Sequence, residues 1–396
     1  MATTAQPTSQ SLSPREWVRK NLFSTWYNGI LTIICLVTLV QGVLGLISWI
    51  FGAAQWTVVG VNLRLFFVGQ FPADLYWRVW TSVAIIAGLT GISWGFTQKN
   101  ARLFSRPLLF TLGVAIAAII LLPLGLPPRL WLLAIALVGA VGYGVGRQLP
   151  ATISPWLPVA WGLAFVVIWW FIKGGLGLEP TETGVWSGLL LTLLTATISI
   201  VLSFPLGVLL ALGRQSKLPV VRAFCTIYIE VIRGLPLIGI LFLAQVMLPL
   251  FLPPNFRQLD RVLRAIAGLV LFSAAYLAEN VRGGLQAVPR GQGEAASALG
   301  LSTPLAVSLI VLPQALRAVI PAIVGQLIGL FKDTSLLALF GLLELTGIAR
   351  SVLSQPEFIG RYAEVYLFIG LIYWVFCYAM SLASRRLERQ LNVSQR

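Results

Sequence analysis

Side chains able to carry acid–base, nucleophilic or metal chemistry are scarce in this chain of 396 residues. Histidine is absent, and the three cysteines, Cys35, Cys225 and Cys377, lie inside apolar stretches with no CxxC pattern. This usage predicts neither a disulfide framework nor a zinc site. The 13 acidic residues form no recognisable catalytic constellation. We therefore expect no catalytic residue and no metal ligand, and we do not expect the chain to be an enzyme.

Two acid–base pairs stand out because each has a three-residue spacing near the end of an apolar stretch. Glu230 and Arg233 precede a Gly-Leu-Pro break, and Glu279 and Arg282 precede two glycines. Residues three apart share one face of a helix, so the members of each pair can neutralise each other. A paired charge costs less in a membrane than a single one. The Glu230–Arg233 pair fits a structural role as well as a gating role. The Glu279–Arg282 pair lies next to the alanine-rich segment 293–300, so we favour a role in transmitting the movement of that segment.

A third polar group interrupts an apolar passage near residue 330. It consists of Lys332, Asp333, Thr334 and Ser335. Polar groups at membrane depth face protein or water, because lipid cannot satisfy them. By themselves these residues fit an outer loop between two spans as well as a polar site inside the protein.

The segment "GEAASALG", residues 293–300, is rich in alanine and less hydrophobic than the apolar stretches on either side of it. Residues 294–299 are strong helix formers, and Gly300 follows where a left-handed C-terminal cap is needed. We expect about two helical turns, with Glu294 near the helix start, where an acid favours the helix dipole. Small side chains at Ala295, Ala296 and Ala298 would let a partner approach the backbone closely. The alternative is an ordinary surface loop between two spans.

The spacing of this segment resembles the EAA signature of permease subunits of ABC importers. The residues that carry the resemblance are Glu294, Ala295, Ala296, Gly300, Ile310, Leu312 and Pro313. Three flanking blocks, residues 228–236, 278–292 and 312–336, look like the polar amino-acid branch of that family, the histidine, glutamine and glutamate type. The resemblance covers about residues 186–390. A weaker likeness, at residues 67–80, is to the long permeases of general or neutral amino-acid import systems.

This resemblance implies roles for the residues that match. Glu294, Ala295, Ala296, Gly300 and the Leu312-Pro313 pair would form a coupling element that sits in a groove of a separate ATPase subunit. The Glu230–Arg233 block would matter for structure or conformation rather than for substrate contact. Residues 332–336, "KDTSL", would form a structured break near the translocation path, after which "LLALFGLLEL" returns toward the membrane.

The implied partners agree with one independent observation. No GxxxxGK[ST] phosphate loop occurs in the chain, so we expect no cofactor in this chain and ATP to be bound by a partner subunit. The resemblance implies an ABC ATPase subunit, a second permease subunit that is a homologous heteromer, an external solute-binding protein and an amino-acid substrate.

The elements that must position these residues follow from composition. The chain is 58% hydrophobic and 10% charged. Its apolar runs are about 20 residues long, the length of a membrane-spanning helix, and show no strand alternation. The sequence therefore predicts an all-α, polytopic integral membrane protein. About ten spans are expected, near 28–52, 78–97, 108–126, 130–147, 155–172, 186–212, 224–252, 265–281, 305–330 and 362–384. Eight is the alternative count, because the pair 108–126 and 130–147 is short and tightly joined.

The charge distribution predicts orientation in a plasma (inner) membrane. The net charge of +15 comes mostly from basic residues in loops and tails, so it reflects topology and not nucleic-acid binding. Basic residues before the first span and after the last predict cytoplasmic termini, and the loop with Lys99, Arg102 and Arg106 is then also cytoplasmic. One loop does not fit this rule, because its three arginines would face outside: Arg257, Arg261 and Arg264.

A boundary is predicted at residues 173–184, where glycine, proline and glutamate interrupt the apolar pattern. We expect a cytoplasmic tail at 1–26, a transmembrane extension at 27–175, and an importer permease core of type I at 185–390 with a coupling loop at 282–304. The predicted function is that of a permease subunit in ATP-driven amino-acid import. The alternative is a secondary amino-acid transporter that works without an ATPase, although no convincing repeat relates the two halves. An integral-membrane transferase is disfavoured by the missing catalytic groups.

Overall fold

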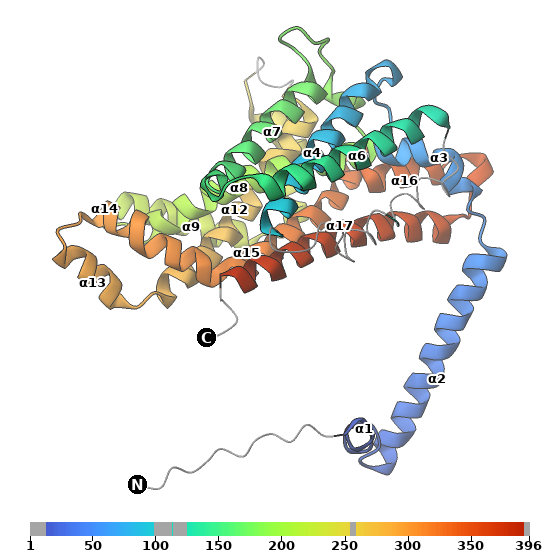
Figure 1. The fold of residues 1–396 in the computed structure, drawn as a ribbon, viewed down its shortest axis with the longest axis horizontal. Helices are drawn as coiled ribbons and strands as arrows, with labels where there is room; N and C mark the ends of the chain where they lie inside the picture. The colour runs from blue at the N-terminus through green and yellow to red at the C-terminus, as the bar shows by residue number, and fades with distance from the viewer. Residues whose placement is uncertain (1–12, 99–112, 114–124, 254–258, 392–396) are drawn as a thin grey trace. The chain divides into compact units, whose positions relative to one another are not determined.

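The structure is a computed structural model that describes residues 13–98, 113, 125–253 and 259–391. Within these residues the regular secondary structure is helical throughout, with two isolated bridges and no strand (Figure 1). The all-α class predicted from the length of the apolar runs is confirmed.

Eight helices in the described part of the chain are long and apolar enough to cross a bilayer. They are Trp26–Ala53, Ala73–Thr97, Leu126–Gln148, Trp156–Lys173, Gly188–Arg214, Arg261–Ala287, Thr303–Phe340 and Tyr362–Arg389. A bent pair, Pro219–Gly234 with Leu237–Phe251, makes a ninth if it is one span. Each predicted span that falls on described residues matches one of these. The predicted span 108–126 and the loop with Lys99, Arg102 and Arg106 lie outside the described residues.

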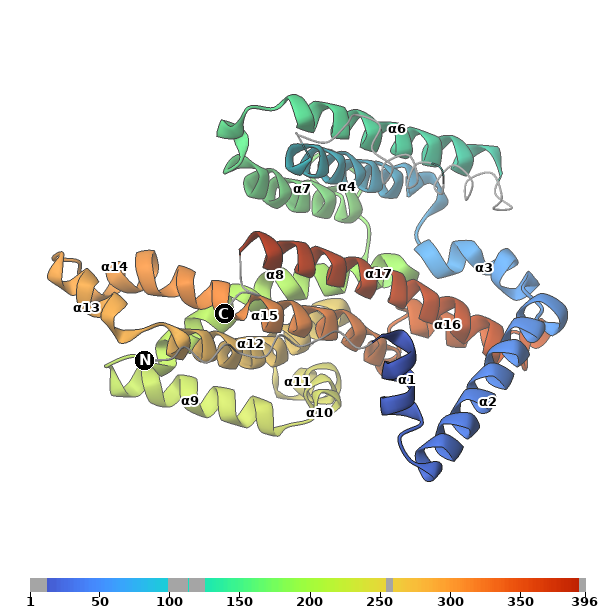
Figure 2. The same ribbon diagram turned by 60° about the horizontal axis from the view of Figure 1, so that its bottom comes forward.

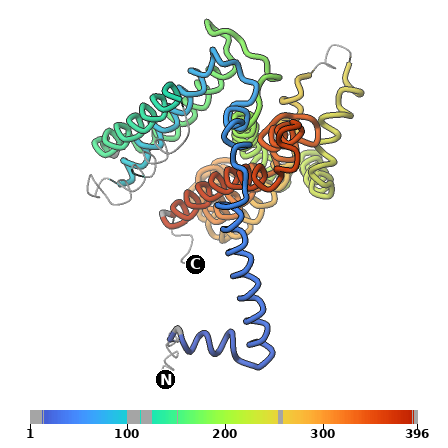
Figure 3. The backbone as a smooth tube through the Cα atoms, turned by 90° about the vertical axis from the view of Figure 1, so that its right-hand side faces the viewer, coloured from blue at the N-terminus to red at the C-terminus, as the bar shows by residue number. Residues whose placement is uncertain are grey.

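Residues up to Thr57 form a compact unit of their own. It contains α1 (Pro14–Leu22) and α2 (Trp26–Ser48), and α2 continues as a π-helical turn, Trp49–Ala53. Figure 3 shows the sharp change of direction between α1 and α2 at the blue end of the tube. Every side chain of α2 is at least partly exposed within this unit, as expected for a lipid-facing span.

Residues 58–396 form the second compact unit. Its first part holds α3 (Thr57–Val68), α4 (Tyr76–Thr97), α6 (Leu126–Gln148) and α7 (Trp156–Lys173), of which the last three lie side by side in Figure 2. The short helix α3 was not among the predicted spans, because its 12 residues are too few to cross a bilayer.

Glycines let α4 and α6 approach until their backbones touch. A β-carbon at Gly95 would lie 2.1 Å from the carbonyl oxygen of Tyr143, and one at Gly146 would lie 2.1 Å from that of Ile92. Close backbone approach through small residues is the usual way in which membrane helices pack, since lipid offers no hydrophobic drive between them.

The second part of this unit is built around α12 (Arg261–Ala287), which packs against α8 (Gly188–Arg214), α9 (Pro219–Gly234) and α15 (Leu312–Asp333). α17 (Tyr362–Gln390) packs on α15. The face of α8 that is buried consists mainly of small residues at helical spacing: Thr192, Thr195, Ser199, Ser203, Gly207 and Ala211. A β-carbon at Gly207 would come within 2.6 Å of Leu277 Cβ, so glycine is also needed for close packing between α8 and α12.

In the described part of the chain, a sharp bend interrupts one pair of apolar helices. α9 and α10 (Leu237–Phe242) meet at 105° around Pro236, because the residue before a proline is pushed out of the helical region. Leu235 has that extended conformation, with φ −98° and ψ 142°. After α10 the chain continues through a π-helical turn, Leu243–Met247, into α11 (Leu248–Phe251).

The other long span is continuous from Thr303 to Phe340. It consists of α14 (Thr303–Ala306), a π-helical turn, α15 and a 3₁₀ segment, Thr334–Phe340. It ends at Gly341, whose φ of 72° is left-handed, and α16 (Leu345–Leu353) follows. The coupling candidate, α13 (Arg290–Ala298), lies between α12 and α14.

Contacts within residues 58–396 run across the boundary predicted at 173–184. The backbone amide of Gln70 donates to Ser187 Oγ at 2.6 Å, and the buried Arg78 donates from Nη1 to the carbonyl of Glu179 at 2.7 Å. A shared apolar core contains Phe71 and Trp186. These contacts join the predicted extension to the predicted permease core. The division into a tail, an extension and a permease core stays a prediction.

Candidate functional site: an exposed helix and its charge network

The helix α13 begins earlier than the sequence predicts. It starts at Arg290, after Pro289, so Glu294 lies in its middle and its first turn holds no acid. The predicted interaction of Glu294 with the helix dipole is therefore wrong, since that effect fades beyond the first turn. Glu294 is exposed.

The predicted left-handed cap at Gly300 is confirmed. Its φ is 79°, its amide donates to the carbonyl of Ser297 at 3.0 Å, and the next amide, of Leu301, donates to that of Ala296 at 3.1 Å. This pair of bonds is a Schellman motif, which satisfies carbonyls at the end of a helix. Because a β-carbon at Gly300 would meet no atom within 4 Å, glycine is required there for its backbone angle and not for space.

The alanines of α13 differ in their surroundings. Ala295 and Ala298 are exposed, but Ala296 is 1% exposed. Ala296 therefore faces its own chain and cannot be a contact for a partner, which corrects the expectation that all three alanines form an approach surface. α13 packs against the π-helical turn Val307–Val311, and a larger side chain at Ala296 would disturb that packing.

The start of α15 is tied to α13. Gln314 Nε2 donates to Gln292 Oε1 at 3.2 Å and to the carbonyl of Ile310 at 3.0 Å. Pro313 lies in the first turn of α15, after a π-helical turn, and Leu312 is half-buried beside an apolar cluster. The proline has no amide to donate, so the wider turn at 307–311 lies where the α-helical ladder is interrupted.

The four predicted charges form one network with a fifth residue. Arg282 donates to Glu279 from both Nε and Nη2, at 2.8 to 3.1 Å, so the predicted pair at this spacing is confirmed. Arg214 at the end of α8 lies between the two acids, 2.7 Å from Glu230 and 2.6 Å from Glu279. Arg233 approaches Glu279 at 3.4 Å.

The pairing of Glu230 with Arg233 predicted from helix spacing is therefore wrong. The two charges instead bind partners on other helices, Arg214 and Glu279, because those helices come within reach in the folded chain. The sequence analysis did not single out Arg214, which the structure places in contact with both acids. Three arginines and two glutamates together link α8, α9 and α12 close to α13.

Residues 332–335 do not break the span. Lys332 and Asp333 are the last residues of α15, and a 3₁₀ helix continues from Thr334 to Phe340. The helical segment ends at Gly341 and not at residues 332–335. The expectation of a break at these residues is thus corrected to a narrowing of the helix. Thr334 is fully buried and donates from Oγ1 to the carbonyl of Phe331 at 2.7 Å, whereas Lys332 is exposed.

Glu344, which sequence reasoning did not single out, is a fully buried acid. Its carboxylate caps α16 by accepting from the amides of Thr346 and Gly347, both at 2.9 Å, and it accepts from Tyr373 Oη on α17 at 3.0 Å. Burial raises the pKa of this carboxyl from 4.5 to about 7. The signal that could have found it is an acid inside the apolar run "LLALFGLLEL".

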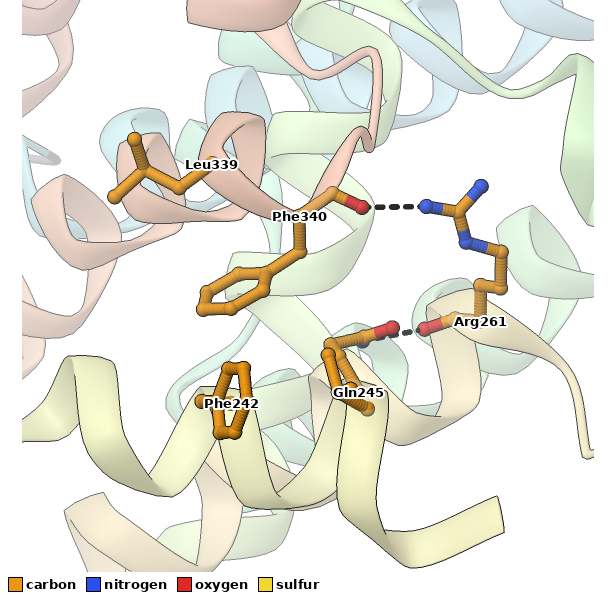
Figure 4. A pocket seen from close by; sticks show the side chains of 6 residues that line it. Phe242, Gln245, Arg261, Leu339 and Phe340 are labelled. Carbon is orange, nitrogen blue, oxygen red and sulfur yellow. Dashed lines mark hydrogen bonds between the residues drawn. The ribbon is translucent and has the colours of Figure 1, made fainter. Parts of the chain in front are cut away.

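A cavity of about 370 Å³ lies where α10, its π-helical continuation, the start of α12 and the 3₁₀ segment meet (Figure 4). Its wall is mostly apolar and carries the guanidinium of Arg261. This group donates to the carbonyl of Phe340, while Gln245 Nε2 donates to the carbonyl of Arg261 at 2.8 Å. Arg264 similarly donates to the carbonyl of Gln245. Two of the three arginines that did not fit the charge rule are thus bound to backbone carbonyls, and Arg257 lies outside the described residues.

The fold and the site define a class: a multi-pass helical membrane protein with a capped, exposed helix that follows a helix carrying part of a charge network. A family model described as the inner membrane component of binding-protein-dependent transport systems matches residues 203–393. The chain is 36% identical over 396 residues to the inner membrane amino-acid ABC transporter permease protein YhdY of Escherichia coli K12, covering 96% of this chain and 93% of that protein.

A second full-length relative is the glutamate/glutamine/aspartate/asparagine transport system permease protein BztC of Rhodobacter capsulatus, 34% identical over 446 residues and the whole of both chains. The probable glutamine ABC transporter permease GlnP of Bacillus subtilis is 39% identical over 204 residues, which is 52% of this chain and 92% of that protein. The chain belongs to the amino-acid ABC transporter permeases, as the spacing of its EAA segment predicts. Nothing supports the alternative of a secondary transporter.

Proposed function

We propose that this permease, paired with a second homologous permease subunit, forms the path for a polar amino acid, and that a separate ATPase subunit grips α13. The observation that carries the proposal is the environment of α13: one side packs against its own chain through Ala296, and most of its other residues are exposed. Glu294, Ala295, Ser297 and Ala298 are exposed, and Leu299 at the tip is 80% exposed.

A helix that transmits a movement must be firmly connected to the helices that it displaces. The Schellman cap at Gly300, the buried Ala296 and the Gln292–Gln314 hydrogen bond fix α13 to the start of α15. On the other side, α12 leads directly into α13 and carries Glu279 and Arg282 of the charge network. A displacement of α13 would thus reach both α12 and α15, and α8 and α9 through Arg214.

The mechanism follows from this linkage. ATP is bound by the ATPase subunits, and their closure would push the coupling helices of the two permeases together. This movement would switch the translocation path between a state open to the outside and a state open to the cytoplasm. Residues 332–335 are proposed to lie along the translocation path, and Thr334 is the most buried of the four. An external solute-binding protein would deliver the substrate. The relatives named for glutamate, glutamine, aspartate and asparagine support an acidic or amide amino acid.

Both termini and α13 are proposed to face the cytoplasm. The test uses a variant in which the native cysteines are replaced and Ser297 is changed to cysteine. With the ATPase subunit present, this cysteine should crosslink to it and should be labelled only from the cytoplasmic side. A matched control places the cysteine at the exposed Ser351 in α16, which should not crosslink to the ATPase.

The transport class is tested separately. Uptake in cells should persist when the proton gradient is collapsed while ATP is maintained, and the complex extracted in mild detergent should contain an ATPase. Gradient-driven uptake by this chain alone in liposomes, with no ATPase, would refute the proposal. Labelling of the Ser297→Cys variant from outside intact cells would refute the orientation alone.

A further inference from the structure

The first described helix, α1, has its own start signal. Pro14 is its first residue, and Ser13 caps it: the amide of Glu16 donates to Ser13 Oγ at 3.3 Å, and the amide of Ser13 donates to Glu16 Oε2 at 3.1 Å. This reciprocal capping box satisfies two amides that a helix start leaves unpaired. The nine residues of α1 therefore form a defined helix and not a fraying extension of α2.

The joint between α1 and α2 is fixed by hydrogen bonds. Thr32 Oγ1, nearly two turns inside α2, donates to the carbonyl of Leu22 at 2.8 Å, and Asn28 Nδ2 donates to Ser24 Oγ at 2.9 Å. Thr25 is extended, which turns the chain between the two helices, as Figure 3 shows. α1 is thus held at an angle to the end of the span instead of extending it.

α1 has an apolar side and a basic side. At about 100° per residue, Trp17, Val18 and Leu22 lie in one half of the helix circumference and the three basic residues in the other half, with Arg15 next to Leu22 at the boundary. Trp17 is 50% exposed and Val18 is 40% exposed. The charged face holds Arg15, Arg19 and Lys20, with Glu16 engaged in the capping box.

The position of α1 in the chain, just before a membrane span, indicates which surroundings its apolar and basic sides contact. The spanning helix begins at Trp26, only a few residues after Leu22, and opens with Trp26 and Tyr27, which are 79% and 57% exposed. Exposed tryptophan and tyrosine at the end of a span mark the level of the lipid headgroups. A helix held at an angle to the span at this point lies at the membrane surface, where an apolar face meets acyl chains and a basic face meets phosphate groups.

We propose that α1 is an interfacial anchor that binds anionic phospholipid headgroups through Arg15, Arg19 and Lys20, with Trp17, Val18 and Leu22 inserted among the acyl chains. The proposal rests on the membrane assignment of α2 and not on the coupling role of α13. Each basic side chain near an anionic surface changes partitioning about five-fold.

The test measures hydrogen exchange of the amides in residues 14–22, with the full chain in nanodiscs. Protection should be higher in phosphatidylcholine mixed with phosphatidylglycerol than in phosphatidylcholine alone, and added salt should reduce the difference because it screens surface charge. The triple variant Arg15→Gln, Arg19→Gln, Lys20→Gln should lose the phosphatidylglycerol-dependent part, on the order of a 100-fold change in partitioning.

A charge-matched control changes Arg385, Arg386 and Arg389, exposed residues near the end of α17, to glutamine and should leave exchange in α1 unchanged. Replacing Trp17 with serine should lower protection in both lipids, because it removes the inserted side chain. Equal protection in the two lipids, or protection that appears only when the ATPase subunit is added, would overturn the proposal; the second result would show that α1 docks on protein.

Discussion

Arg214 at the end of α8 donates to Glu279 of α12 at 2.6 Å, and this contact joins the two helices about two turns before α12 ends at Ala287. Glu279 is also held by Arg282 and Arg233, so one carboxylate balances three guanidinium groups. Arg214 reaches the more exposed Glu230 as well, which brings α9 into the same network. Glu279 is therefore the central acid of the network, whereas Glu230 is a peripheral acid that contacts Arg214 alone among the network's arginines.

The two acids of the network should differ strongly when neutralised. Glu279→Gln leaves three arginines close together without their shared partner and should lower the free energy of unfolding by about 2 kcal/mol or more, with loss of uptake. Glu230→Gln should cost less than about 1 kcal/mol, since its side chain is 54% exposed. Thermal unfolding in detergent and uptake in cells measure both. Equal losses in the two variants would mean that Glu279 is not the centre.

The cap of α13 can be tested with two glycines of the same segment. Gly300→Ala forces a side chain into a left-handed conformation, at a cost of about 1–2 kcal/mol. It should misdirect the end of α13 and lower the amount of ATPase that co-purifies. Gly293→Ala is the matched control, because this glycine is helical and a β-carbon there meets nothing within 4 Å. It should retain the ATPase and stabilise the helix slightly. Normal retention in Gly300→Ala would show that the cap is dispensable for docking.

Glu344 predicts a dependence of stability on pH. Its pKa is 4.5 when exposed and about 7 in the fold, so the folded protein binds this proton more tightly than the unfolded chain does. The stability that it contributes is full below pH 4.5 and is lost as the pH rises through 7. The melting temperature of the wild type should therefore fall more steeply over this range than that of Glu344→Gln, which cannot titrate. Glu357→Gln, an exposed acid nearby in sequence, should keep the wild-type slope. Identical slopes for all three proteins would contradict the assignment.

The contact between α4 and α6 should tolerate no β-carbon at its closest points. Gly95→Ala would place a methyl group 2.1 Å from the carbonyl oxygen of Tyr143, and this collision should separate the helices and reduce the amount of folded protein. Gly144→Ala, on the same pair of helices but with nothing within 4 Å, should be neutral or mildly stabilising. Fluorescence-detected size exclusion after mild extraction reports on both. A Gly95→Ala protein that behaves as the wild type would show that the two helices can move apart at little cost.

Local signals were enough to predict most of the fold. The long apolar runs predicted the spans, since a bilayer sets the length of a helix that crosses it. The glycine after "EAASAL" predicted the left-handed cap, because that conformation depends on a single residue. The spacing of the EAA segment predicted the family, because Glu294, Gly300 and Pro313 are all readable from one stretch of chain.

What the tertiary structure decided is which distant residues meet. Spacing alone paired Glu230 with Arg233, yet helix packing brings Arg214 and Glu279 closer to them. Periodicity also left Ala296 indistinguishable from Ala295, although only the first packs inside. Glu344 was overlooked because its burial depends on helices packed around it, among them α17, whose Tyr373 donates to it. A one-dimensional pattern records which faces are apolar, whereas the choice of partner depends on how closely small residues let the helices approach, and that is a property of the packed bundle.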